Sequence, residues 1–261
     1  MPELPDVEIF RRRFARGSLH KPVARVHVRD ASLIEGTSGR SLSRRLKGDT
    51  FERTRRHGKH MAAETSEHGW LILHFGMTGY VQPMRNGDTE EPDHTALLID
   101  FEDDSRLAYI NKRRLGKIRL VDDFDEFIDA EDLGPDAMDL SLKGFREIVD
   151  GRSGAIKALL MNQNALAGVG NVYADEALFH AGVRPSRKSS DLSDDEVKTI
   201  HRNLRHVLKG AIKHGARPDD MPRSWLLPRR EKGAECPRCG GSIRKTTVGG
   251  RATYWCGEHQ T

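Results

Sequence analysis

The spacing of apolar and polar positions changes about halfway along the chain. Apolar side chains spaced among charged ones in residues 1–14 predict a short helix. From residue 20 to 120 the pattern predicts strands, with valines alternating with polar or small neighbours over 23–28 and an apolar run over 70–75. A long series of short strands is typical of a β-sandwich or barrel.

Beyond residue 130 the pattern favours helices. Ser193-Asp-Asp-Glu196 has the sequence of a capping box, and an amphipathic helix follows it until Gly215, a suitable stop. Two shorter helices are predicted at 154–163 and 173–181, on either side of a glycine-rich turn. A linker is expected near 121–135. The apolar face of the long helix consists of Val197, Ile200, Leu204, Val207, Leu208, Ala211 and Ile212.

Three cysteines and a histidine lie close together near the end of the chain, with the spacing Cys236-x2-Cys239-x16-Cys256-x2-His259. An odd, clustered set of cysteines argues against a disulfide framework and for a metal site in a reducing compartment. Each x2 pair can point two ligands at one tetrahedral ion, so the spacing predicts a structural zinc ribbon. A closed set of four ligands leaves no open position for metal catalysis.

Gly249-Gly250 precedes Arg251 between the two halves of the metal motif. Glycines at a hairpin tip allow the backbone to approach a partner closely, and a guanidinium can fork onto a phosphate. Taken alone, Arg251 could equally be an arginine of a solvated turn.

The charge distribution adds a candidate partner. The net charge is only +4, but residues 221–261 hold eight basic against three acidic side chains. An excess of five positive charges in so short a segment suits a phosphate-bearing partner. No apolar run approaches the length of a membrane span, and the acidic start differs from a secretory signal peptide. We therefore expect an intracellular, cytoplasmic protein without a membrane partner.

The N-terminus, Met1-Pro-Glu3, offers unusual chemistry if Met1 is removed. Pro2 would then carry a terminal secondary amine, and α-amino groups titrate near about 7.7–8.0, so part of the population is neutral and nucleophilic. Such an amine can form an iminium with an electrophilic sugar carbon, and Glu3 is a candidate general acid. Taken alone, Pro and Glu early in a chain are more often ordinary residues at a helix start.

Five segments occur in a characteristic order. These are MPELPDVE at the start, His57-Gly-Lys-His60, His74-Phe-Gly-Met-Thr-Gly79, the stretch AGVGNVYADE at 167–176 and the cysteine hairpin. Together they closely resemble the formamidopyrimidine-DNA glycosylase / endonuclease VIII family, over nearly the whole chain.

The resemblance implies an α+β fold. It consists of an N-terminal β-sandwich flanked by helices, then a helix–two-turn–helix domain with a C-terminal zinc-finger hairpin. With the segmentation above, this gives domains at 1–125, 126–220 and 221–261. The implied activity is bifunctional: base excision repair by a DNA glycosylase and AP lyase, acting as a nucleoid-associated monomer on double-stranded DNA that contains a damaged base or abasic site.

The resemblance also implies roles for individual residues. Pro2 would attack C1′ of the damaged nucleotide, Glu3 would assist sugar-ring opening, and Lys59 would lie beside the lesion phosphate. β- and then δ-elimination would cut the strand. The residues implied to bind DNA are His74, Met77, Arg113, Leu115, Lys157, Asn171 and Arg251. Met77, Arg113 and Leu115 would fill the space left by the flipped nucleotide, while Asn171 and Arg251 would grip the backbone, with Lys157 as a further phosphate contact.

The sequence departs from the family pattern at four places, which affects the expected substrate and the expected zinc ligands. Leu115 replaces an aromatic wedge, Asp6 stands where one branch commonly has Glu, and His259 replaces the last zinc cysteine. The stretch between Gly215 and Cys236 is short, where members that recognise 8-oxoguanine carry a longer loop. Oxidised pyrimidines and ring-opened purines therefore stand beside 8-oxoguanine as substrates.

Two other functions compete with this one. The first is a non-catalytic protein that uses the same residues to bind damaged DNA, although a binder would have no need of an N-terminal amine. The second is a zinc-ribbon module fused to an unrelated enzyme, which the continuity of motifs from residue 2 to 259 argues against.

Overall fold

The computed structural model describes residues 1–84, 88 and 90–261, and they form two compact units. The first consists of Met1–Pro2 and Asp6–Glu131, and the second of Glu3–Pro5 and Asp132–Thr261. The predicted helical segment and the predicted metal hairpin thus belong to one unit. No helix among the described residues is both long and apolar enough to cross a membrane.

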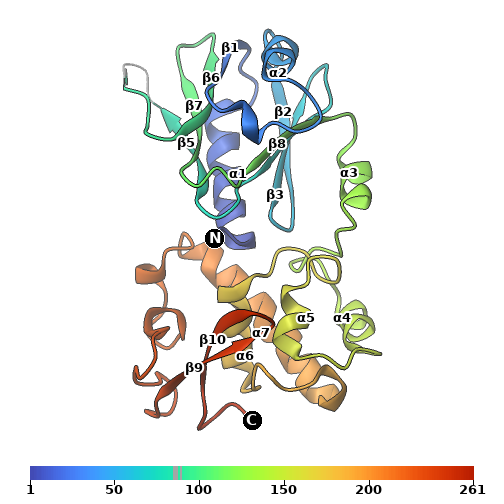
Figure 1. The fold of residues 1–261 in the computed structure, drawn as a ribbon, viewed down its shortest axis with the longest axis vertical. Helices are drawn as coiled ribbons and strands as arrows, with labels where there is room; N and C mark the ends of the chain where they lie inside the picture. Colours follow the sequence, from blue (N-terminus) through green and yellow to red (C-terminus); the bar gives the residue numbers. More distant parts are fainter. Residues whose placement is uncertain (85–87, 89) are drawn as a thin grey trace. The chain divides into compact units, whose positions relative to one another are not determined.

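Two antiparallel four-stranded sheets form the first unit, which confirms the β-sandwich (Figure 1). One sheet has the order β1-β6-β7-β5 and the other the order β2-β3-β4-β8. The strands are β1 (Val23–Val28), β2 (Phe51–His57), β3 (His60–Thr65), β4 (Trp70–His74), β5 (Gly79–Met84), β6 (Thr95–Phe101), β7 (Arg106–Asn111) and β8 (Lys117–Val121).

The alternation predicted for β1 is interrupted. Val23 and Val26 are buried although they lie three residues apart, because the register between β1 and β6 shifts between Val23 and Arg25. A bulge of this kind adds a residue to one strand and so returns the next valine to the core face.

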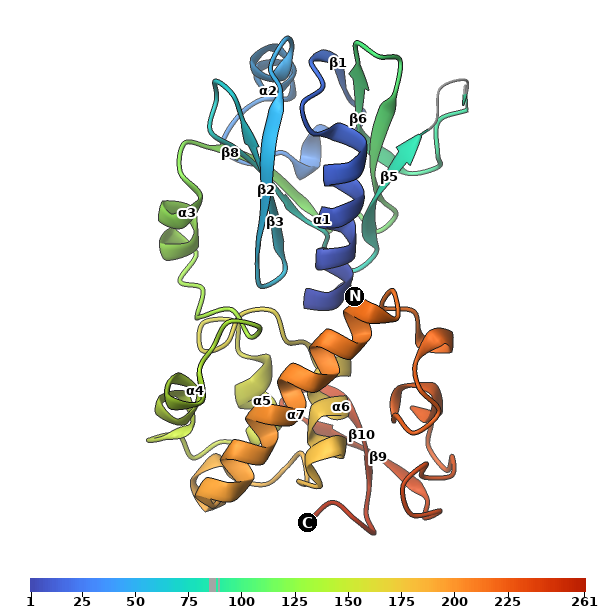
Figure 2. The ribbon, with the colours of Figure 1, turned by 180° about the vertical axis from the view of Figure 1, so that it is seen from behind.

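Helices cover the open sides of this sandwich. The helix α1 (Leu4–Ser18) runs lengthwise beside both sheets (Figure 2), and its Val7 and Phe14 enter the apolar core between them. The helix α2 (Gly39–Leu46) and the 3-10 turn η1 (Ala31–Leu33) lie between β1 and β2 in sequence.

The linker expected near 121–135 contains a helix, α3 (Phe124–Ala130), so that expectation is wrong in part. Asp123 caps α3 by accepting from the N–H groups of Asp125 and Glu126, and Phe124 and Phe127 pack on Trp70 and Ile72. Burial of these two rings, rather than helical periodicity, stabilises so short an element.

The second unit is helical and carries a two-stranded hairpin. Its helices are α4 (Leu142–Val149), α5 (Ile156–Met161), α6 (Asn171–Ala181) and α7 (Asp194–Lys213), with 3-10 turns η2 (Ser189–Asp191), η3 (Pro218–Asp220) and η4 (Leu227–Arg229). The hairpin consists of β9 (Ile243–Val248) and β10 (Arg251–Cys256). The capping box at Ser193 and Glu196 is confirmed, and Gly215 has a φ of +69° just beyond α7.

Two half-buried histidines on adjacent strands should make the stability of the protein depend on pH. His60 of β3 pairs with His74 of β4, and their ring centroids lie 5.0 Å apart under Phe127 of α3. Burial lowers the pKa of His60 to about 3 and that of His74 to about 4, and His74 further lowers the pKa of His60. Both rings are therefore neutral in the folded protein at pH 5.

We expect the free energy of unfolding to fall as the pH is lowered from 6.5 to 5. The unfolded chain then binds protons at these histidines and the folded protein does not, which costs about 1–2 kcal/mol per histidine over that range. Urea denaturation at several pH values measures this loss. His60→Gln should flatten the profile, whereas His206→Gln, at an exposed position of α7, should leave it parallel to that of the wild type. Identical profiles for His60→Gln and the wild type would contradict the expectation.

Candidate functional site

The side chain of Glu3 lies at the N-terminus of α6, within the second unit. Its carboxylate accepts hydrogen bonds from the backbone N–H groups of Gly170 at 2.9 Å, Val172 at 2.8 Å and Tyr173 at 3.2 Å. The first N–H groups of a helix have no partner within it, and its dipole favours negative charge there. The side chain of Glu3 is 2% exposed and is held in place by these bonds. Since Glu3 follows Pro2 in the chain, the backbone next to Pro2 is held as well.

The helix α6 (Asn171–Ala181) begins two residues before the start predicted from the sequence, 173. The Oδ1 atom of Asn171 is buried and has no hydrogen-bond partner among the described residues. A buried acceptor without a partner is costly, so it suits a group whose partner arrives with a ligand.

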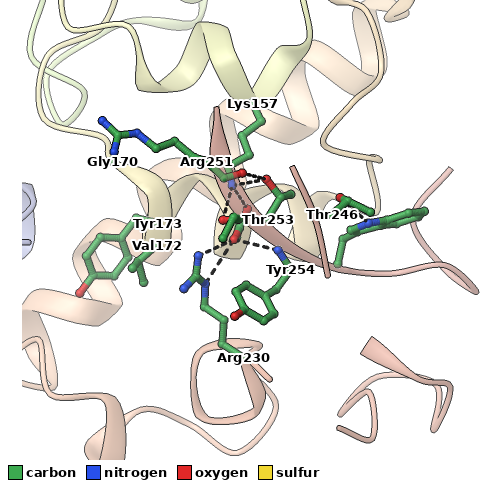
Figure 3. A network of polar contacts seen from close by, with 12 residues as sticks. Lys157, Gly170, Val172, Tyr173, Arg230, Thr246, Arg251, Thr253 and Tyr254 are labelled. Carbon is green, nitrogen blue, oxygen red and sulfur yellow. Dashed lines mark hydrogen bonds and ion pairs between the residues drawn. The ribbon is translucent and has the colours of Figure 1, made fainter. Parts of the chain in front are cut away.

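Lys157 has a different environment from the one predicted. Its side chain is fully buried, and its Nζ lies 2.6 Å from Oδ1 of Asp175 and donates to Oγ1 of Thr253 at 2.7 Å. The direct phosphate contact expected for Lys157 is therefore wrong for this conformation, because its ammonium has no exposed surface. Figure 3 shows Lys157 above the strand that carries Thr253 and Arg251.

Asp175 is the centre of this network, and the motif analysis did not single it out. Besides Lys157, it accepts from Nη2 of Arg230 at 2.7 Å and from the N–H of Tyr254 at 3.1 Å. Burial lowers the pKa of Lys157 and raises that of Asp175, while the two cations oppose the latter shift. The carboxylate thereby links α5, α6, the segment after η4 and β10 (Figure 3).

Arg251 follows a two-residue turn, as predicted. Gly249 and Gly250 have φ values of +57° and +71°, and Val248 pairs with Arg251 across the hairpin. Positive φ at both positions is the geometry that glycine favours in tight hairpins. The carbonyl of Arg251 accepts from Thr253, while its side chain is exposed and extends away from the buried network (Figure 3).

The four predicted zinc ligands converge. Their ligand atoms all lie within 4.8 Å of one another, and three of the separations are 3.6 Å (Cys236 Sγ–His259 Nδ1), 3.4 Å (Cys239 Sγ–Cys256 Sγ) and 3.8 Å (Cys239 Sγ–His259 Nδ1). A tetrahedral zinc ion with ordinary bond lengths requires separations of about 3.6–3.8 Å. The donor set therefore fits one closed, structural zinc site.

His259 is oriented as a metal ligand. Its Nε2 lies 3.3 Å from the carbonyl oxygen of Phe179, which is the acceptor expected for a donating Nε2–H. Nδ1 then faces the sulfur atoms, and burial lowers the pKa of His259, which favours the neutral ring that zinc binds.

Within the first unit, Lys59 lies at the tip of the β2–β3 hairpin. Its neighbour Gly58 has a φ of +54°, and His57 pairs with His60 on either side of the turn. His74 ends β4 and is half-buried against His60. Burial lowers the pKa of His74, and the nearby cations Lys59 and Lys117 lower it further, while Glu131 and Glu35 oppose that shift.

Met77 and Leu115 are exposed although they are apolar. Among the described residues, the exposed large apolar side chains are Met1 at 55%, Met77 at 39% and Leu115 at 49%. The N–H of Arg113 donates to Thr78 Oγ1 at 3.1 Å, which joins the turn that bears Met77 to the turn that bears Leu115. Met77 and Leu115 are thus two of these three side chains, and they are the ones that the resemblance implies would fill the space left by the flipped nucleotide.

Comparison with known proteins identifies the family. Residues 1–118 match the formamidopyrimidine-DNA glycosylase N-terminal domain, 133–220 its H2TH domain, and 233–257 a zinc finger found in FPG and IleRS. The formamidopyrimidine-DNA glycosylase of Geobacter metallireducens is 35% identical over 100% of both chains. This chain belongs to that family of DNA glycosylases.

Other relatives agree with this assignment. The formamidopyrimidine-DNA glycosylase of Bacillus subtilis is 31% identical over 100% of this chain and 99% of its own. The Lactococcus lactis enzyme bound to DNA with an AP site has a TM-score of 0.88 at 27% identity, covering 99% of each chain. The same enzyme bound to Fapy-dG DNA has a TM-score of 0.88 at 26% identity, covering 99% of this chain and 100% of its own. The predicted helix–two-turn–helix and zinc-finger domains of the family are thereby confirmed, although the zinc-finger match ends before His259.

Proposed function

We propose that this protein removes oxidised bases from double-stranded DNA and then cuts the strand as an AP lyase. The observation that carries the proposal is the position of Glu3. Three N–H groups at the start of α6, one of them on the preceding Gly170, bind the carboxylate of Glu3. The residue next to the proposed nucleophile is therefore held rigidly. Fixed geometry of this kind is what a nucleophile and its neighbouring acid or base require.

The chemistry follows from the terminal amine of Pro2. After Met1 is removed, the amine attacks C1′ of the damaged nucleotide, the base leaves, and an iminium joins protein and sugar. β-elimination expels the 3′ phosphate and δ-elimination then expels the 5′ phosphate. Glu3 assists ring opening, while Lys59, Asn171 and Arg251 hold the phosphates beside the lesion.

The segment after α7 bears on the substrate. Where some relatives are expected to carry a longer loop, this chain buries Trp225 and Leu226, and the N–H groups of Leu226 and Leu227 donate to Glu176. A segment pinned in this way has little freedom to cover a flipped base. We therefore propose that 8-oxoguanine is not preferred over formamidopyrimidines or oxidised pyrimidines. From the resemblance to the family, we further propose that one chain binds one duplex.

Trapping with borohydride tests the activity. Duplexes that contain 8-oxoguanine, a formamidopyrimidine, thymine glycol, dihydrouracil or an abasic site are incubated with the protein and reduced. A covalent adduct with the abasic duplex and with at least one damaged base supports the proposal. Binding without an adduct on any duplex would favour the non-catalytic damage-binding function instead.

A further inference from the structure

Met77 and Leu115 lie on two turns that both cross from one sheet of the sandwich to the other. The first joins β4 to β5, and the second joins β7 to β8. Since β4 pairs with β8 and β5 pairs with β7, the two crossings lie side by side at one end of the sandwich, with His74 opposite Lys117 and Gly79 opposite Asn111.

A buried polar residue, Asn111, connects these turns. Asn111 is 2% exposed. Its Nδ2 donates to the carbonyl of Phe75 at 3.2 Å, on the Met77 turn. Its Oδ1 accepts from the N–H of Leu115 at 3.3 Å, on the other turn. The amide orientation is required by its partners, because a carbonyl only accepts and an N–H only donates.

Tyr109 extends the connection. Its hydroxyl donates to the carbonyl of His74 at 2.9 Å and accepts from Nδ2 of Asn111 at 2.9 Å. Burial raises the pKa of Tyr109, so the hydroxyl stays protonated and able to donate. The last residue of β4, the first residue of the Met77 turn and the Leu115 turn are thus joined by two buried side chains.

The glycines of these turns leave room for this arrangement. A Cβ at Gly116 would overlap the Tyr109 hydroxyl and Nδ2 of Asn111, and a Cβ at Gly76 would overlap the carbonyl of Leu115. The backbones of the two turns therefore pack directly on each other, and the exposed side chains of Met77 and Leu115 extend from a common, rigid base.

We propose that Asn111 is a positioning residue for the Met77–Leu115 wedge, acting through the two turns and not by touching DNA. This inference rests on the proposed function and on the resemblance to the family, which implies that these two side chains, the wedge, fill the space of the flipped nucleotide. An exposed apolar side chain on a mobile turn would lose conformational freedom on insertion, whereas a turn already fixed by Asn111 loses less.

The test uses the full-length protein and a duplex with a tetrahydrofuran abasic analogue opposite 2-aminopurine, whose fluorescence reports insertion. Asn111→Ala removes three hydrogen bonds, to Phe75, Tyr109 and Leu115. It should reduce the fluorescence change and weaken binding about fivefold, which corresponds to about 1 kcal/mol. In a Met77→Ala/Leu115→Ala background, the same substitution should have no further effect, because coupled residues are not additive. Asn111→Asp keeps the acceptor for Leu115 but loses the donor to Phe75, so it should fall between Asn111→Ala and the wild type.

Thr65→Ala is the matched control. Thr65 is also buried, and its hydroxyl donates to the carbonyl of Gly69 at the β3–β4 turn. Thr65→Ala should lower the free energy of unfolding, measured by urea denaturation, without changing the fluorescence signal. The inference is overturned if Thr65→Ala reproduces the Asn111→Ala effect, if Asn111→Ala has none, or if its effect persists without Met77 and Leu115. Borohydride trapping of the wild type on an abasic duplex is scored separately, so failure of the chemistry is distinguishable from failure of the wedge inference.

Discussion

A form of this protein extended at its N-terminus should form no borohydride adduct with abasic DNA until the extension is removed. In the extended form the nitrogen of Pro2 is part of a peptide bond, and its lone pair is delocalised into the carbonyl. Only a free amine can attack the sugar carbon. We expect the trapping rate to fall at least ~100-fold, the range in which loss of a catalytic group is normally measured.

The matched control is the same preparation after a protease has exposed Pro2 as the first residue. Adduct formation should then recover fully, while binding to an uncleavable abasic duplex is measured before and after removal. The extended form should still bind the abasic duplex. Met1 is 55% exposed, so residues added before Pro2 can extend into solvent without displacing the fold. Full trapping by the extended protein would assign the nucleophile to another amine, such as a lysine.

Local patterns predicted those elements whose cause lies within a few residues. The capping box at Ser193, the turn at Gly249-Gly250 and the ligand pairs around Cys236 and Cys256 each depend on short-range spacing, and the structure confirms them. The sandwich was also predicted, since alternation over several strands reports a sheet with one buried face.

What the sequence could not indicate depends on distant partners. Lys157 was expected to contact a phosphate, because nothing near it in sequence reveals that Asp175 and Thr253 surround its ammonium. The helix α3 lies in an expected linker, since seven residues hold too few turns to display a helical period. Asn111 likewise gains its role only when two crossings meet.

The site shows the same division. Glu3, Asn171 and Arg251 were proposed as site residues from their motifs. The structure places them at the start of α6 or on the hairpin packed against it. Asp175 and Glu176, which follow in the same helix, tie the later segments to α6. A single carboxylate in a helix does not indicate burial. Two adjacent acidic residues within an otherwise apolar helix, as here, could have indicated that they are buried and paired.

The second large effect is expected at Asp175. Asp175→Ala should lower the free energy of unfolding by about 3–5 kcal/mol, the usual cost of removing one partner from a buried ion pair. Lys157 would keep a fully buried ammonium without its ion-pair partner, and the N–H of Tyr254 would lose its acceptor. Urea denaturation of the zinc-loaded protein measures the loss.

Two further variants separate charge from packing. Lys157→Met with Asp175→Leu removes the two fully buried charges at similar volume. It should cost less than Asp175→Ala because no buried ammonium is left unpaired, although Arg230 and the N–H of Tyr254 lose their acceptor in both variants. Glu147→Ala removes an exposed partner, 3.9 Å from Lys143, and should change the stability by less than about 0.5 kcal/mol. If Asp175→Ala were no more costly than Glu147→Ala, the network would not stabilise the unit. Because Thr253 connects Lys157 to the carbonyl of Arg251, the variants at Asp175 and Lys157 should also weaken binding to an abasic duplex, whereas Glu147→Ala should not.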